Sequence, residues 1–172
     1  MGQSEERYLV RKSNNFVFSA VVGPFLDIAL RKLKRKLNWD VFLRKYFPEK
    51  NALKRYYYFD YHKEDYRGIS YINKLESFGF ELISKRLPPR SQEIVKELIA
   101  VEIGTDVGFF CASKEIAKLK VVCPFRELKY PLKLARDLGL KVVLVDFSEL
   151  PPDLVSLSSE LIIIPESDSI FI

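Results

Sequence analysis

Short apolar runs alternate along this chain with longer segments in which apolar residues recur every three or four positions. The apolar runs stop at turn-forming residues, which is typical of strands buried in a parallel sheet. They predict strands over residues 15–22, 54–61, 80–86, 119–123, 141–147 and 161–164. The periodic segments predict helices over residues 25–37, 39–47, 66–78, 106–117 and 127–138. This alternation predicts an α/β fold with right-handed crossovers and a mostly parallel central sheet of about five strands.

Individual residues place several of the helix ends. Asn38 is a favourable cap for the start of the second helix, and Gly79 and Gly139 follow the ends of two others. Residues 93–102 stay ambiguous, because their pattern is compatible with a helix and with the return arm of a hairpin formed with residues 80–86.

The end of the first predicted strand is the place where an α/β sheet would carry a functional site. The apolar run 16–22 stops at Gly23, and Pro24 and Phe25 open the following helix. Ligands and catalytic groups gather at such strand ends. Val22, Pro24 and Phe25 can neither bind a metal nor move a proton, so the chemistry expected of this position is missing.

The composition is typical of one globular domain. We expect this domain over residues 15–172, with a flexible arm over residues 1–14 before it. The chain has 172 residues, 48% of them hydrophobic and 30% charged. No apolar run approaches the roughly 20 residues needed to span a bilayer, so we expect no membrane contact and a cytoplasmic location. Cys111 and Cys123 lie in apolar segments and are interpreted as buried thiols, the alternative being a disulfide or a metal site. No cofactor is expected, because two cysteines and His62 cannot complete a four-ligand zinc site.

Basic residues outnumber acidic ones, 28 to 23, which gives a net charge of +5 and mildly favours a polyanionic partner. A dense basic run on the first helix is either the solvated face of an amphipathic helix or a set of phosphate contacts. A second set mixes cations with tyrosines, which stack on single-stranded bases, although alternate residues of a strand point into the core. The candidate contacts to nucleic acid are Arg31, Lys32, Lys34, Arg35, Lys36, Arg55, Tyr57, Lys63, Arg67 and Arg126.

A series of segments carries a likeness that covers most of the chain, from residue 16 to residue 165. The segments are 18–30, 38–40, 55–58, 75–83, 104–107, 121–132 and 138–142. In this order and at this spacing they resemble the NYN family, the PIN-like ribonuclease domains that include the LabA-like proteins. The resemblance implies a three-layer PIN-like, Rossmann-like domain. It also favours the hairpin for residues 93–102.

The family's catalytic acids are mostly absent from this chain. Its first aspartate and its asparagine align with Val22 and Phe25, and its helical aspartate pair aligns with Asp106 and Ala112. Its Gly-Asp-Gly-Asp loop aligns with residues 125–128. The degenerate positions are therefore Val22, Phe25, Asp106, Ala112, Arg126 and Leu128. Metal-dependent hydrolysis needs several converging carboxylates, so the resemblance implies an inactive relative with no catalytic residues.

Acidic residues elsewhere give an alternative. Strand ends share one edge of a parallel sheet, so a relocated metal site is one interpretation and turn-capping acids are the other. The residues concerned are Asp60, Asp106, Glu127 and Asp146.

The sequence thus predicts a catalytically inactive NYN/PIN-like domain that binds RNA or other single-stranded nucleic acid, or serves as a regulatory adaptor. One alternative is a protein-interaction or homodimer module using Phe25, Phe109, Phe110 and residues 170–172. The other is a metal-dependent ribonuclease with a relocated acidic site.

Overall fold

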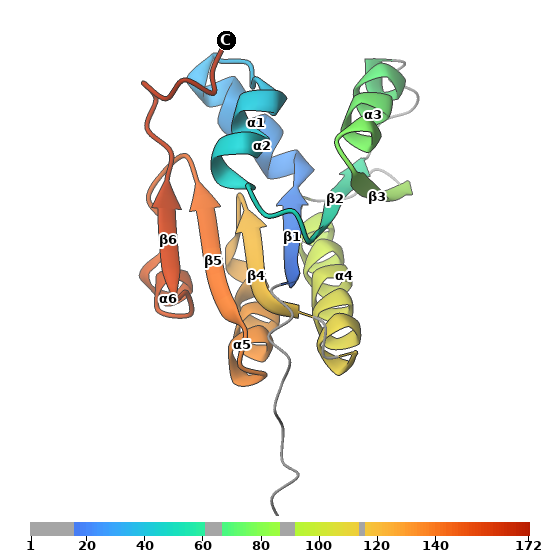
Figure 1. Cartoon of the computed structure of the whole chain (residues 1–172), viewed down its shortest axis with the longest axis vertical. Helices are drawn as coiled ribbons and strands as arrows, with labels where there is room; N and C mark the ends of the chain where they lie inside the picture. Colours follow the sequence, from blue (N-terminus) through green and yellow to red (C-terminus); the bar gives the residue numbers. More distant parts are fainter. Residues whose placement is uncertain (1–15, 61–66, 87–91, 114–115) are drawn as a thin grey trace, which may run out of the picture.

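A sheet of six parallel strands forms the centre of the molecule (Figure 1). The computed structural model describes residues 16–60, 67–86, 92–113 and 116–172. The strands are β1 (Phe16–Val22), β2 (Ala52–Asp60), β3 (Phe80–Arg86), β4 (Ile116–Val122), β5 (Lys141–Asp146) and β6 (Glu160–Ile163). They are arranged in the order β3-β2-β1-β4-β5-β6. The predicted α/β class is confirmed, with six strands, all parallel, in place of about five mostly parallel ones.

Helices cover both faces of the sheet, which makes three layers of a Rossmann-like fold. The helical elements are α1 (Gly23–Leu33), α2 (Trp39–Tyr46), α3 (Arg67–Ser77), α4 (Gln92–Ala112), the short turn η1 (Arg126–Leu128), α5 (Lys129–Asp137) and α6 (Pro152–Val155). Residues of α1, α2 and α3 pack on one face, and residues of α4, η1, α5 and α6 pack on the other. No helix within the described residues is long and apolar enough to cross a membrane.

The central strand β1 explains why the apolar runs predicted buried strands. All of its residues except Phe16 are buried, since helices cover both faces of the sheet. Phe18, Ala20 and Val22 point toward the α4–α5 layer, whereas Val21 points toward the α1–α2 layer. This alternation follows from the two-residue repeat of an extended chain.

The predicted hairpin over residues 93–102 is wrong, because this segment is the first half of the long helix α4. Val95, Ile99, Ile103 and Val107 recur every four residues and are buried against the sheet. The helix continues through residues 104–112, so the predicted helix at 106–117 is only its last turns. Strand β4 consequently begins at Ile116 rather than at residue 119.

The first helix is shorter than predicted because the C-terminal segment competes for its last residues. The helix ends at Leu33, and Lys34 adopts a left-handed conformation with φ of 52°. Leu37 then forms an antiparallel bridge with Phe171, and the backbone nitrogen of Asn38 donates to Ile170 O at 2.7 Å. The chain therefore leaves the helix to pair with its own C-terminal segment.

The predicted residues at the helix ends are confirmed. The Asn38 side chain caps α2 by accepting from the Val41 backbone nitrogen. Gly79 and Gly139 have φ of 81° and 85° beyond the ends of α3 and α5, a conformation that glycine adopts without steric cost. The predicted arm over residues 1–14 lies outside the described residues.

Candidate functional site

The strand order places the switch point of the fold, where the connections change from one face of the sheet to the other, between β1 and β4. From β1 the chain crosses to one face of the sheet, and from β4 it crosses to the other. Open α/β sheets bind their ligands at such a switch point, outside the carboxyl ends of the strands. We call this end of the sheet the carboxyl edge. Gly23 and Phe25 follow β1 there, and Cys123 and Phe125 follow β4.

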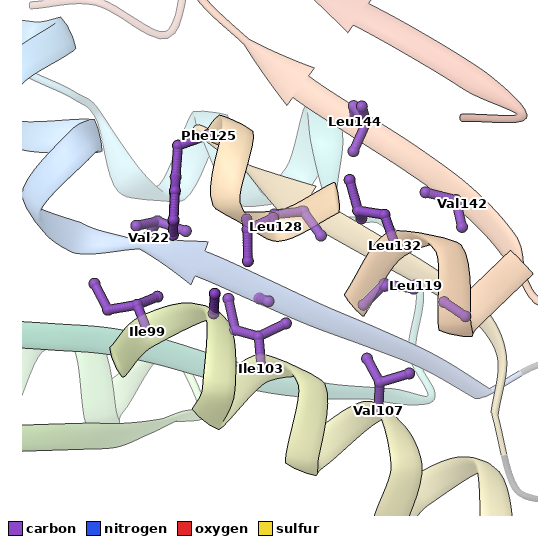
Figure 2. Packing of buried hydrophobic residues seen from close by; sticks show 14 of the residues in the cluster. Val22, Ile99, Ile103, Val107, Leu119, Phe125, Leu128, Leu132, Val142 and Leu144 are labelled. Atoms are coloured by element: carbon purple, nitrogen blue, oxygen red, sulfur yellow. The ribbon is translucent and has the colours of Figure 1, made fainter. Parts of the chain in front are cut away.

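Aromatic side chains occupy this position. The rings of Phe25 and Phe125 are stacked, with centroids 4.8 Å apart and planes 13° apart. Figure 2 shows Phe125 and Leu128 reaching toward the end of β1 at Val22. Val22 and Leu128 are completely buried. The switch point is therefore filled mainly by carbon atoms packed on the hydrophobic core, and one cation stands beside it, with Lys96 Nζ 5.8 Å from the Phe25 ring centroid.

Gly23 has a packing role at the same place. A Cβ atom on Gly23 would approach Cε1 of Tyr56 to 2.5 Å, closer than carbon atoms in contact ever lie. Glycine is therefore required so that the Tyr56 ring can pack beneath the first turn of α1. The strand–glycine pattern noted in the sequence is explained by this close approach.

Asp106, the one residue that aligns with an aspartate of the NYN pattern, is held by two side chains of β2. Tyr57 Oη donates to Asp106 Oδ2 at 2.5 Å, and Arg55 Nη1 donates to Asp106 Oδ1 at 2.5 Å. Burial lowers the pKa of Arg55, but its hydrogen bond to Asp106 and the charge of that carboxylate raise the pKa overall. Burial, followed by the bond to Asp106, raises the pKa of Tyr57. Both carboxylate oxygens are thus engaged within the protein.

Arg55 and Tyr57 are for this reason poor contacts for nucleic acid, and that prediction is corrected. Tyr57 is 0% exposed, so its ring cannot stack on a base. The Arg55 guanidinium lies between Asp106 and Glu81 and over the Phe110 ring, 5.0 Å from its centroid. Arg and Tyr two residues apart on one strand share a face, and this spacing is the sequence signal that would have indicated a common partner.

Among the other candidate acids, Asp146 serves local structure. Asp146 Oδ1 accepts from the backbone nitrogens of Phe147 at 2.6 Å and Ser148 at 3.2 Å, which caps the turn after β5. Burial raises the pKa of Asp146, although these hydrogen bonds lower it. Glu127 Oε1 lies 4.0 Å from Lys96 Nζ, and Glu127 Oε2 is buried without a hydrogen-bond partner among the described residues.

These acids do not converge. Asp60 ends β2 and Asp146 ends β5, and β1 and β4 lie between those strands. The backbones of β2 and β5 are therefore three strand spacings apart, roughly 14 Å. Among the described residues, no three His, Cys, Asp or Glu side chains lie close enough together to hold a metal.

The other positions at which catalytic residues of the NYN pattern are replaced, Ala112, Arg126 and Leu128, are spread over the α4–α5 layer. Arg126 is exposed, with Nε 3.4 Å from Asp153 Oδ2, while Leu128 is buried and Ala112 ends α4. Cys123 is buried as predicted, whereas Cys111 is only partly buried. The two cysteines form no disulfide, and burial raises the pKa of both thiols.

Basic side chains gather instead at the C-terminal end of α1, which Figure 1 shows at the arrowhead end of the strands. We call Arg31, Lys32, Lys34, Arg35 and Lys36 the basic segment. All five are exposed, and four of them border an open hollow of about 500 Å³. The hollow is lined by Asp27, Leu30, Arg31, Lys34, Arg35 and Lys36. Within the described ranges, none of the five cations forms an ion pair with a carboxylate.

The structure places few of the other candidate residues. Lys63 lies outside the described residues, and Arg67 is placed only as the first residue of α3. Among the apolar interface candidates, Phe25 and Phe110 pack against the core and Ile170 is buried. Phe109 and Ile172 are exposed.

Comparison with known proteins supports the fold alone. No protein-family model matches the chain, and no curated protein matches it. Among solved structures the chain is similar to the crystal structure of a protein of unknown function, VPA0982, from Vibrio parahaemolyticus RIMD 2210633. The TM-score is 0.65 at 13% identity, over 93% of this chain and 98% of that one. Membership in the NYN family therefore stays a prediction.

Proposed function

We propose that this domain is a non-catalytic, NYN-like module that binds single-stranded nucleic acid through the basic segment. The observation that carries the proposal is the exposure of five cations, four of which line one hollow, without ion-pair partners among the described residues. Phosphate groups supply the missing counter-charge, and their binding releases condensed cations from the nucleic acid. The hollow is open to solvent, and its lining includes both Arg31 and Arg35, so a phosphate group can approach these two side chains.

The side chains at the carboxyl edge of the sheet support a non-catalytic role. Hydrolysis of a phosphodiester requires charged groups that activate water and stabilise the leaving oxygen. The switch point presents stacked phenylalanines, and Asp106 is already bound by Arg55 and Tyr57. We therefore assign these side chains to stability, and the basic segment to function.

Neutralising the basic segment tests this proposal. The variant Lys32→Gln/Arg35→Gln/Lys36→Gln removes three charges from exposed positions. We expect its affinity for a labelled single-stranded RNA to fall at least tenfold, and the slope of log K against log salt to decrease by about 2, at roughly 0.7 per lost contact. Fluorescence anisotropy over a range of salt concentrations measures both quantities.

A charge-matched control separates local contact from net charge. Lys50→Gln/Lys74→Gln/Arg136→Gln also removes three exposed charges, but from other parts of the surface. Its affinity and salt slope should stay close to those of the wild type. Equal losses in both variants, or no RNA binding by the wild type at low salt, would contradict the proposal.

A second candidate function is protein association without nucleic acid. It is favoured by exposed apolar side chains on α4 and α5, among them Val101, Phe109 and Tyr130. Failure of the wild type to bind RNA or DNA, together with stable self-association, would support this candidate instead.

A further inference from the structure

Helix α4 is apolar on two sides, which is unusual for a helix in the outer layer of a domain. Its inner side packs on the sheet through Ile99, Ile103 and neighbouring residues. On its outer side Val101 and Phe109 are 64% and 69% exposed. Outer-layer helices normally present polar residues to water, whereas a helix that is apolar all round is typically covered on both sides. The outer side of α4 is therefore suited to burial.

Helix α5 extends this apolar surface. Tyr130 is 80% exposed, and Leu134 also reaches the surface. Between the two helices lies a shallow cavity of about 410 Å³, which we call the α4–α5 groove. Its lining is mainly apolar, with one acidic residue, and consists of Ala100, Val101, Gly104, Glu127, Tyr130, Pro131 and Leu134. Contiguous exposed apolar surface of this kind marks an interaction site.

Charges on either side of the groove are complementary to each other. Glu97 is exposed on α4, one turn before Val101, and Lys129 is exposed at the start of α5. Neither forms an ion pair with another described residue. Both helices run from the carboxyl edge toward the opposite edge of the sheet, because each follows one strand and precedes the next. A two-fold axis parallel to the helices thus sets α4 of one copy against α5 of another.

We propose that the α4–α5 groove is the interface of a homodimer whose occupant is a second copy of this chain. In this arrangement Tyr130 of each copy covers Gly104 and Val101 of the other, and Glu97 faces Lys129. The contact is isologous, so one surface patch satisfies both subunits. The dimer leaves the basic segment accessible, since α1 packs on the opposite face of the sheet. This inference is independent of nucleic-acid binding.

Sedimentation equilibrium of the full chain tests the interface. We expect the wild type to dimerise and Val101→Glu or Tyr130→Glu to raise the dimer dissociation constant at least tenfold, about 1.4 kcal/mol. Ile172→Glu is the control, because Ile172 is 72% exposed but belongs to the C-terminal segment. Its dissociation constant should equal that of the wild type. A monomeric wild type, or unchanged dimerisation of both groove variants, overturns the proposal.

Reversing the charge of Glu97 or Lys129 tests whether α4 of one copy packs against α5 of the other, and it places no charge inside the groove. Glu97→Lys and Lys129→Glu each bring like charges together, and each should weaken dimerisation roughly two- to fivefold. Mixing the two variants restores opposite charges at both contacts, so a heterodimer should form with the wild-type dissociation constant. Circular dichroism checks that every variant is folded. A mixture that associates no better than either variant alone contradicts the pairing of α4 with α5.

Discussion

At the scale of single residues, the role of an acidic side chain depends on its contacts in the fold more than on its alignment with a motif. Asp106 occupies a position that the family resemblance associates with metal binding, yet Arg55 and Tyr57 occupy its oxygens. A buried carboxylate with two donors stabilises the fold by satisfying both of them. Sequence alone reveals the acid but not the donors, because Arg55 and Asp106 are 51 residues apart.

Asp106→Ala should therefore act on stability. The substitution leaves the largely buried Arg55 side chain without its inner carboxylate and the Tyr57 hydroxyl without its partner. We expect the free energy of unfolding to fall by about 3 kcal/mol. Urea denaturation measures this, and Glu81→Ala is the matched control at the exposed end of the same ion-pair network, with a loss below about 1 kcal/mol. Unchanged stability together with altered RNA cleavage would assign Asp106 to chemistry.

Asp146 gives a pH-dependent prediction. Because burial raises its pKa above the ordinary 3.8, the folded protein holds this proton more tightly than the unfolded chain. Ionisation of Asp146 therefore lowers stability as the pH rises through the folded-state pKa. Asp146→Asn keeps the acceptor Oδ1 and removes the charge.

We expect Asp146→Asn to exceed the wild type in stability at about pH 7 and to match it at about pH 3, below both pKa values. Urea denaturation at the two pH values measures the difference. A variant less stable than the wild type at neutral pH would show that the carboxylate charge is needed at the end of β5.

At the scale of elements, the apolar runs were sufficient to locate every strand of the sheet. Parallel strands are buried on both faces, so β1 and β5 appear as continuous hydrophobic stretches. The pattern left residues 93–102 open between helix and hairpin, because α4 is apolar on both sides, and the family resemblance then favoured the wrong alternative. It also misplaced the end of α1, which is set by pairing with the distant Phe171.

The two central glycines of α4 give a matched pair of variants. A Cβ on Gly108 would meet no atom within 4 Å, so Gly108→Ala should raise the free energy of unfolding by about 0.5–1 kcal/mol through helix propensity. A Cβ on Gly104 would lie 3.4 Å from Pro131 Cγ, so the gain from Gly104→Ala should be smaller. Denaturation at low protein concentration, where self-association does not contribute, compares them. A larger gain at Gly104 would contradict this packing.

At the scale of the whole molecule, topology brings together residues that no local pattern connects. The alternation of strands and helices was enough to predict the layered α/β architecture, but the strand order is a property of the complete sheet. The stack of Phe25 on Phe125 joins segments 100 residues apart and fills the switch point with apolar side chains. The basic segment, by contrast, was predictable because it is continuous in sequence and lies at a solvated helix end.

The most direct test of the account is the fate of a single-stranded RNA held by the wild-type protein. We predict that labelled RNA incubated with excess protein and Mn²⁺ is bound, as seen by a mobility shift, and is recovered at full length on a denaturing gel. Binding without cleavage is expected because the basic segment supplies cations, while the carboxyl edge supplies packed phenylalanines. Mn²⁺-dependent cleavage that disappears in the Asp106→Asn variant, with its fold intact, would contradict this account.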